Sequence, residues 1–530
     1  MNDRPNFLFI ITDQHRADHL GCSGHPVLQT PNIDAIAARG RRFERFYVAN
    51  PVCMPNRSTL MTGRMPSVHG VRHNGIPLSL RSNTFVDLMR ADGYHTGLMG
   101  KAHLQNMTAY PAIMERRAVP GGRTAPFEEF AEALKPVAGD APYDQESPVR
   151  WGSGEFAPMT LPFYGFEHVD LCTDHADRVG GHYFHWFSER HPDPNSLRGS
   201  ENALPHDYTC PQAWRTAVPE ELYPTRYVEE KSLEYIDARA ADHQPFFAMV
   251  SFPDPHHPFT PPGKYWGMYD PADMTLPRSF ELVNDPPPHL AWAYAAREQG
   301  TAQTNAQNAF AVNERETREA MALTCGMIAM VDDAIGAILA RLEQHGLADN
   351  TVVVFTSDHG DFLGDHRLML KGPVHYHGLT RVPFIWADTP DRAKPGTSDA
   401  MCGTVDIAST ILERVNLEAY NGIQGRNLLH ATAGEDDDND AMLIEADDQR
   451  SIFGFHTAVR MRTLITRRWR MSVYQGVEWG EIYDLENDPD EMVNLWDDTS
   501  HAATRADLME TLARKQIDLV DRSPFPTARA

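Results

Sequence analysis

The amino-acid sequence predicts an α/β fold built on a large, mostly parallel central sheet that is flanked by helices. Three observations lead to this class. Continuous apolar runs such as Asn6–Thr12 and Phe246–Phe252 are typical of strands that are covered on both faces. Helical segments alternate with these runs, as parallel strands require. After the acidic run Glu435–Asp440, short β-rich segments predict a smaller C-terminal antiparallel sheet that ends in a helix.

Each predicted element has a local signal. Thr30 is the expected cap of a helix with Pro31 in its first turn, and Gly40 ends it. The further predicted elements are a helix at Thr84–Ala91, a strand at His95–Met99, helices at Arg226–Ala241 and Glu316–His345, and strands at Val352–Phe355 and Val382–Trp386. In the tail we expect strands at Ser451–Phe455, Met461–Thr466 and Trp469–Tyr474 and an amphipathic helix at Ala503–Leu519.

Two segments interrupt this alternation. Residues 105–220 are rich in Pro, Gly, His and aromatic residues and show little periodicity, so we expect either an insertion over the active-site mouth or a surface excursion. The segment His289–Asn313 is rich in Ala and Gln, which suits an arm for self-association into a homo-oligomer or a plain insertion of loop and helix. We expect a catalytic domain at 1–435 and a C-terminal subdomain at 436–530.

Composition excludes several classes of protein. The formal charge of −25 argues against a general nucleic-acid binder. No window reaches the ~18 consecutive apolar residues of a membrane span. The N-terminus carries no recognisable signal peptide, so we expect a cytoplasmic protein without a membrane partner. The six cysteines show no Cys-x-x-Cys pair or zinc spacing.

One short stretch, Asn50–Arg64, combines a cysteine, a proline and an arginine at fixed spacing. Pro55 suits the first turn of a helix that ends at Gly63. Cys53 would then stand at a helix N-terminus, which favours an anion, and Arg57 would add a planar fork for phosphate or sulfate oxygens. A cysteine before a short helix is more often a small buried apolar residue. The surrounding sequence therefore has to decide between the two interpretations.

Polar residues follow the other predicted strands where they end. They are Asp13-Gln14, the pair Lys101 and His103, His256, and Asp358-His359. In a parallel sheet the carboxyl ends of the strands meet at one edge, where α/β enzymes bind their ligands. The sequence therefore predicts that these side chains and Cys53 share one crevice.

Cys53–Gly63 resembles the signature of the type I sulfatases and the related phosphonate monoester hydrolases of the alkaline phosphatase superfamily. The resemblance spans most of 5–415 and reappears at 482–495, where Ile482-Tyr483-Asp484-Leu485 lies. It implies an alkaline-phosphatase-like sandwich fold and the oxidation of Cys53 to formylglycine by a maturation enzyme. Asn56 differs, because many sulfatases carry serine there.

The resemblance also implies one divalent metal ion. Asp13, Asp358 and His359 match the family's metal ligands, together with the formylglycine at Cys53. Gln14 falls where many sulfatases have a second aspartate ligand, and glutamine there resembles the phosphonate hydrolases. Oxygen-rich ligation favours Ca²⁺, with Mn²⁺ as the alternative because histidine is a ligand.

The remaining catalytic residues are carried over in the same way. Arg57 would hold the hydrated formylglycine and the oxyanion. Lys101 and His103 match the family's Gly-Lys-x-His pattern, and Lys371 matches its second lysine. Both lysines would neutralise charge on the sulfuryl or phosphoryl oxygens, and His103 would take the proton that regenerates the aldehyde.

The assignments of two residues expected to contact the substrate, His256 and Asn74, are less certain in position than the others. His256 matches the histidine that protonates the leaving oxygen, although His257 beside it leaves room for a shift by one residue. Asn74 aligns with a substrate-contacting asparagine of the phosphonate hydrolases.

The predicted function is the hydrolysis of sulfate monoesters, with aryl or small alkyl sulfates as substrates. The alternative is a phosphonate monoester or phosphodiester hydrolase on the same scaffold, with promiscuity between the two. Gln14 and Asn74 favour the alternative, whereas the intact pair Lys101 and His103 favours the sulfatase. A non-catalytic protein with a relic site is disfavoured because every catalytic position is filled, and a phosphomutase would require serine or threonine as nucleophile.

Overall fold

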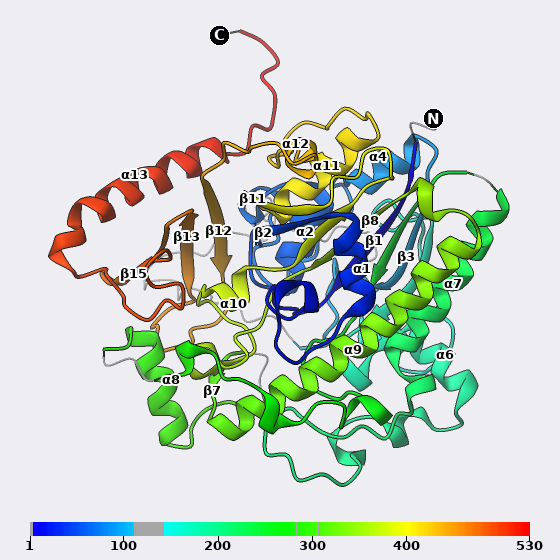
Figure 1. Ribbon diagram of the computed structural model, residues 1–530, viewed down its shortest axis with the longest axis horizontal. Coiled ribbons are helices and arrows are strands. Elements are labelled where there is room, and N and C mark those ends of the chain that lie inside the picture. Colours follow the sequence, from blue (N-terminus) through cyan, green and yellow to red (C-terminus); the bar gives the residue numbers. More distant parts are fainter. Residues whose placement is uncertain (1–3, 111–142, 243, 282–284, 306–307, 530) are drawn as a thin grey trace, which may run out of the picture.

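The computed structural model describes residues 4–110, 143–242, 244–281, 285–305 and 308–529. Its centre is a nine-stranded sheet (Figure 1), whose spatial order is β11 (Gly396–Gly403), β2 (Arg41–Tyr47), β10 (Phe384–Ala387), β8 (Thr351–Ser357), β1 (Asn6–Thr12), β6 (Phe246–Ser251), β3 (His95–Lys101), β4 (His168–Thr173) and β5 (Gly180–Gly181). Strands β8, β1, β6, β3 and β4 are consecutive neighbours and run parallel, whereas β10 runs antiparallel to β8 and β2. The predicted mostly parallel sheet is confirmed.

Strand β1 is buried along its whole length because both faces of the sheet are covered by helices. Phe7 and Phe9 enter one apolar core and Leu8 and Ile10 enter the other, as the two-residue period of a strand requires. The first core includes residues of α2 (Cys53–Thr62), α4 (Phe85–Ala91) and α11 (Ile407–Arg414). The second includes residues of α1 (Pro31–Arg39), α6 (His182–Arg190), α7 (Pro224–Asp242) and α9 (Glu314–Gln344).

Helix α9 is long and apolar enough to cross a membrane by length and composition alone. It begins at a capping box formed by Asn313 and Glu316. Within its most apolar window, 78% is buried inside the protein, which is typical of the core helix of a globular fold.

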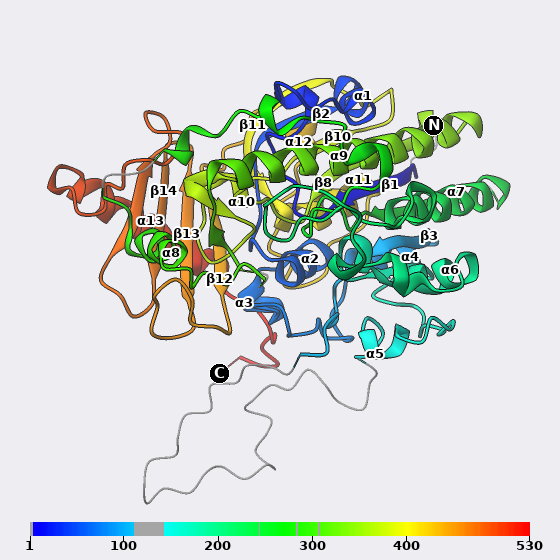
Figure 2. The same cartoon turned by 90° about the horizontal axis from the view of Figure 1, so that it is seen from below.

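A separate four-stranded antiparallel sheet lies beside the large sheet, to the left in Figures 1 and 2. Helix α13 (Ala502–Asp518) packs on this sheet through Leu508 and Leu512. The predicted strand at Ser451–Phe455 is wrong, because that segment contains a turn, and the first and last strands of the sheet were not predicted. The boundary at 435 and 436 stays a prediction. The strands are β12 (Ala441–Asp447), β13 (Arg460–Thr466), β14 (Trp469–Tyr474) and β15 (Gly480–Asp484).

The segment predicted to lack regular structure is only partly irregular. Within 105–220, β4 is a strand of the central sheet and α6 contributes to the second core; residues 111–142 lie outside the described residues. In the Ala- and Gln-rich segment, α8 (Pro288–Glu298) buries Leu290 and Ala293 against Phe453 and Tyr483. This packing is that of an ordinary helical insertion, and self-association stays a prediction.

Candidate active site

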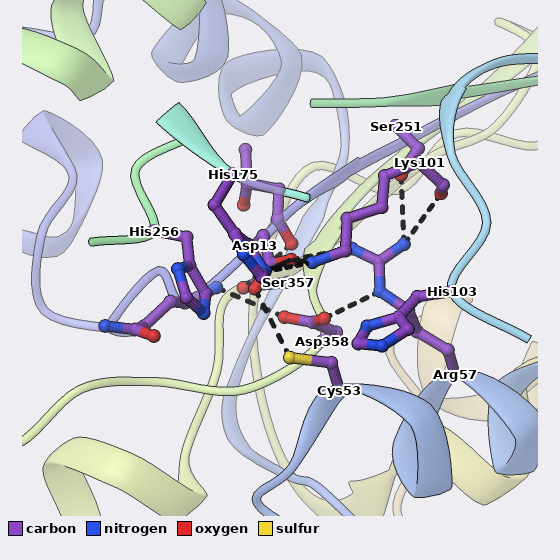
Figure 3. A network of polar contacts seen from close by, with 12 residues as sticks. Asp13, Cys53, Arg57, Lys101, His103, His175, Ser251, His256, Ser357 and Asp358 are labelled. Atoms are coloured by element: carbon purple, nitrogen blue, oxygen red, sulfur yellow. Dashed lines mark hydrogen bonds and ion pairs between the residues drawn. The ribbon is translucent and has the colours of Figure 1, made fainter. Parts of the chain in front are cut away.

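Five parallel strands carry polar side chains at or just beyond their carboxyl ends. Asp13 follows β1, Asp358 follows β8, His256 lies beyond β6, Lys101 ends β3, and His175 follows β4. Because these strands are neighbours in one sheet, the side chains converge at the same edge, as Figure 3 shows. The predicted convergence of these side chains is therefore observed, in a buried group that also contains His175.

Helix α2 presents the cysteine to this group of side chains. Cys53 is the first helical residue, and every residue of the helix is buried. The start of the helix is held in place because Asn74 Oδ1 accepts a hydrogen bond from the Met54 backbone N–H at 3.1 Å. Asn56 Nδ2 donates to the backbone oxygen of Asp358 at 2.5 Å, which joins the helix to the end of β8.

Asp13, Cys53, Asp358 and His359 form a group that could hold a metal ion. Their ligand atoms all lie within 4.8 Å of one another, and all four side chains are buried. His359 Nε2 is 3.5 Å from Asp13 Oδ1 and 3.7 Å from Asp358 Oδ1, so the three atoms face a common centre. Two buried carboxylates and one imidazole fit a divalent cation that accepts oxygen and nitrogen ligands.

Arg57 is buried behind these ligands and orients them. Its Nε donates to Asp358 Oδ2 at 2.7 Å, and its NH1 donates to the backbone oxygen of Lys101 at 2.9 Å and to Ser251 Oγ at 3.0 Å. Its NH2 is buried without a hydrogen bond in the described part of the chain and lies 3.6 Å from Asp13 Oδ2. That nitrogen is available to an anion in the crevice.

Lys371 lies directly against the cysteine. Its Nζ is 3.0 Å from Cys53 Sγ, 2.7 Å from His256 Nε2 and 3.0 Å from His359 Nε2. The side chain is only 4% exposed, so its charge acts in a region of low dielectric constant.

Lys101 enters the site from the end of β3. Its Nζ donates to Asp13 Oδ2 and lies 2.6 Å from His175 Nε2. Gly100 precedes it with a φ of 116°, and a Cβ there would lie 1.9 Å from the backbone oxygen of Ser251. Only glycine therefore lets β3 come close enough to β6 to bring Lys101 into the site.

The two adjacent histidines occupy different environments. His256 Nδ1 donates to the backbone oxygen of His257, so Nε2 is the atom that faces Lys371. His257 Nδ1 instead contacts the side-chain amide of Gln14, at 3.0 Å from its Nε2. Of the two rings, that of His256 is the one next to the cysteine.

Gln14 hydrogen-bonds to the candidate metal ligand Asp358 and to the nearby Asp361. Its backbone N–H donates to Asp358 Oδ1 at 3.1 Å, and its Nε2 donates to Asp361 Oδ2 at 2.5 Å. Its φ of 66° places this residue in the left-handed region that side chains rarely adopt. Such strained residues cluster at functional sites.

Nearby positive charges lower the pKa values of Cys53 and Asp13. Burial and Asp13 act to raise the pKa of the Cys53 thiol, but Lys371, His359 and Lys101 together bring it below its ordinary value. Burial also disfavours the charged form of Asp13, yet Lys101 and Arg57 hold the pKa of that carboxyl well below its usual range. The crevice therefore stabilises negative charge at residues 13 and 53.

His103 is positioned through its backbone. Glu146, which is fully buried, accepts hydrogen bonds from the backbone N–H groups of His103 at 2.6 Å, Leu104 at 2.8 Å and Gln105 at 2.5 Å. These bonds hold His103 at a φ of 53°. Burial raises the pKa of Glu146 to about 7, although the three donors favour the carboxylate.

We expect Glu146→Gln to lower the free energy of unfolding by about 1–3 kcal/mol, because the new amide group leaves a buried N–H donor facing other donors. The effect should depend on pH. The folded-state pKa of about 7 lies above the ordinary 4.5, so the folded protein binds a proton that the unfolded chain has released. The advantage of the wild type is therefore complete below about pH 4.5 and falls as the pH rises to about 7.

Urea unfolding of both proteins at pH 5 and pH 8 measures this difference. Asp144→Asn is the matched control, because Asp144 is an exposed acid in the same segment. A wild-type advantage that is the same at pH 5 and pH 8 would show that Glu146 is ionised in the folded protein at both pH values.

Sequence reasoning missed four residues of this site: His175, Ser251, Asp361 and Glu146. His175 had only a short signal, because Val169, Leu171 and Cys172 alternate or adjoin polar residues before the pair Asp174-His175. Glu146 had none, since its partners are backbone groups 41 to 43 residues away.

A thiol at a helix start, a group of metal ligands and three buried cationic side chains define a hydrolase for esters of tetrahedral oxyanions. Comparison with known families agrees. The family model described as sulfatase matches residues 5–417, and the chain belongs to the sulfatase family. A second model, described as the C-terminal part of N-sulphoglucosamine sulphohydrolase, matches residues 359–518.

Individual relatives include sulfatases and phosphonate hydrolases. An arylsulfatase of Clostridium perfringens is 26% identical over 528 residues, covering 97% of this chain and 95% of that protein. A multifunctional alkaline phosphatase superfamily protein of Trinickia caryophylli is 27% identical, covering 98% and 96%. The solved phosphonate monoester hydrolase of Agrobacterium radiobacter superposes with a TM-score of 0.75 at 25% identity, covering 98% and 97%.

Proposed function

We propose that this sulfuric ester hydrolase acts on aryl or small alkyl sulfate monoesters through a formylglycine made from Cys53. One observation carries the proposal: Cys53 begins a buried helix and lies 3.0 Å from Lys371 and 3.1 Å from His359. Formylglycine would supply a hydroxyl nucleophile in its hydrated form. The protein then depends on a formylglycine-generating enzyme as a partner.

A divalent cation held by Asp13, Asp358, His359 and residue 53 would make the nucleophilic hydroxyl more acidic. We favour Ca²⁺ over Mn²⁺ because carboxylate oxygens dominate the donor set. Arg57 orients Asp358 through its Nε–H, and its NH2, 3.6 Å from Asp13 Oδ2, faces the same centre.

Lys101 and Lys371 hold the sulfuryl oxygens from two sides of the crevice. Both ammonium groups are buried, so each stabilises the charge that grows on these oxygens more strongly than it would in water. Lys101 does not have to move when the charge develops, because it is fixed by Asp13.

His256 protonates the leaving oxygen from Nε2. In the substrate-free structure this nitrogen accepts a hydrogen bond from Lys371, so the role requires Lys371 to turn to the bound ester and Nε2 to take up a proton. Burial lowers its pKa well below the ordinary value, and Lys371 adds to this effect. An anionic ester that binds beside Lys371 offsets that charge and favours the protonated ring. His256 therefore becomes an acid when substrate is present.

A second candidate function, phosphonate monoester hydrolysis, is favoured by Gln14. Glutamine at this position withholds the negative charge that a second aspartate would add beside Asp358. The similarity to the phosphonate monoester hydrolase of Agrobacterium radiobacter also supports it.

Steady-state kinetics separate the two functions. The protein, produced together with a formylglycine-generating enzyme, is assayed with 4-nitrophenyl sulfate and 4-nitrophenyl phenylphosphonate. The mass of the Cys53 peptide should fall by about 18 Da on conversion to the aldehyde. We expect the higher kcat/KM with the sulfate; a higher value with the phosphonate would establish the second candidate.

A further inference from the structure

His175 contacts both Lys101 and His256 and has no counterpart in the motifs found in the sequence. Its Nε2 lies 2.6 Å from Lys101 Nζ and its Nδ1 lies 3.2 Å from Asp174 Oδ1. Its ring is stacked on that of His256, with 3.5 Å between centroids and 14° between planes. Figure 3 shows it beside both residues, and it is 5% exposed.

We propose that His175 is a positioning residue that fixes the ammonium group of Lys101 and the ring plane of His256. The proposal rests on the proposed function, in which Lys101 binds the non-leaving oxygens and His256 protonates the leaving oxygen. His175 alone would thereby hold both the ammonium group of Lys101 and the acid His256 in their working positions.

The hydrogen bonds determine the proton position on His175. A lysine ammonium group can only donate, so His175 Nε2 must accept from Lys101. The ring proton then lies on Nδ1 and is donated to Asp174. Asp174 therefore selects the tautomer that can hold Lys101.

The stacked ring restrains His256. His256 is held in its plane by the hydrogen bond from Nδ1 to the backbone oxygen of His257, and the His257 ring lies 4.0 Å from it between centroids. The contact with His175 is shorter. Close stacking of this kind limits tilting of the ring, and Nε2 stays directed at Lys371.

Metal binding is a weaker explanation of His175. Its ligand atom does lie within 4.8 Å of those of Asp13, Cys53 and His256. However, the ammonium group of Lys101 contacts both Asp13 and His175. The group of Asp13, Cys53, Asp358 and His359 also has two carboxylates against one in the group with His175, and so suits a divalent cation better.

Two substitutions of His175 test its contact with Lys101 and its contact with His256 separately. His175→Phe keeps a ring against His256 and removes the acceptor for Lys101, whereas His175→Gln keeps an acceptor and removes the ring. Both variants, with their formylglycine content measured by mass, are assayed on aryl sulfates whose leaving groups differ in pKa.

We expect His175→Phe to lower kcat/KM by about 10- to 100-fold for good and poor leaving groups alike, as is typical for loss of an orienting partner. His175→Gln should retain activity with 4-nitrophenyl sulfate and lose it progressively with poorer leaving groups, because only those need the proton from His256. Wild-type activity in His175→Phe, or equal losses in both variants on every substrate, would overturn the proposal.

An inactive wild type would be a failure of the proposed function, and one further measurement tests His175 without turnover. Nitrogen-15 spectra of the histidine rings, assigned by comparison with His175→Gln, report its tautomer. We expect the proton on Nδ1 at pH 7. A proton on Nε2 would show that His175 does not accept from Lys101, whatever the activity.

Discussion

Replacing Cys53 by alanine is expected to lower kcat/KM for 4-nitrophenyl sulfate by about 10³-fold or more, because the residue that becomes the nucleophile is lost while the fold remains. The side chain is small and buried, and removing its sulfur should leave α2 intact. Initial rates and the thermal midpoint of the same preparation measure both effects.

Cys22→Ala provides the matched control. Cys22 is a free, partly exposed cysteine away from the site, so its loss removes a thiol without touching the crevice. If Cys53→Ala hydrolysed the ester at the wild-type rate, residue 53 would not be the nucleophile, and a water molecule would have to take that role.

The second large effect is expected for His256→Asn. Loss of the acid should lower kcat/KM by about 10²–10⁴-fold for alkyl and poor aryl leaving groups, since their oxygen must be protonated as it departs. The loss should be much smaller for 4-nitrophenol, which leaves readily as an anion. A plot of log kcat/KM against leaving-group pKa, compared with the wild type, measures the change in slope.

His257→Asn distinguishes the two adjacent rings. The side chain of His257 hydrogen-bonds to Gln14, whereas that of His256 hydrogen-bonds to Lys371, so the His257 variant should keep the wild-type dependence on the leaving group. A steeper slope for His257→Asn than for His256→Asn would transfer the acid role to His257.

Buried strands and the residues at their ends could be predicted because local sequence determines them. The run Asn6–Thr12 is apolar at almost every position, and the structure confirms it as β1 with the same bounds. The start of α2 at Cys53 followed from Pro55 and Gly63 for a similar reason. The parallel direction of these strands then brought Asp13, Lys101 and Asp358 to one edge.

Other features depend on contacts that no local pattern reveals. Strand β2 carries four arginine and glutamate residues among its seven, yet it pairs with β10 and β11. Strand β4 was hidden in a segment rich in loop-forming residues. The contact between Glu146 and the backbone of 103–105 joins segments about forty residues apart, and such pairing is set by tertiary packing.

The burial of Cys53 has a consequence for when the protein can be matured. The thiol is 1% exposed and lies beneath Lys371 and His359, so a second enzyme cannot reach it in the finished fold. The proposed oxidation of Cys53 would therefore have to happen while the chain is still unfolded. On this proposal, a chain that folds first would keep its thiol, and mixing it later with the maturation enzyme would recover activity only after denaturation and refolding.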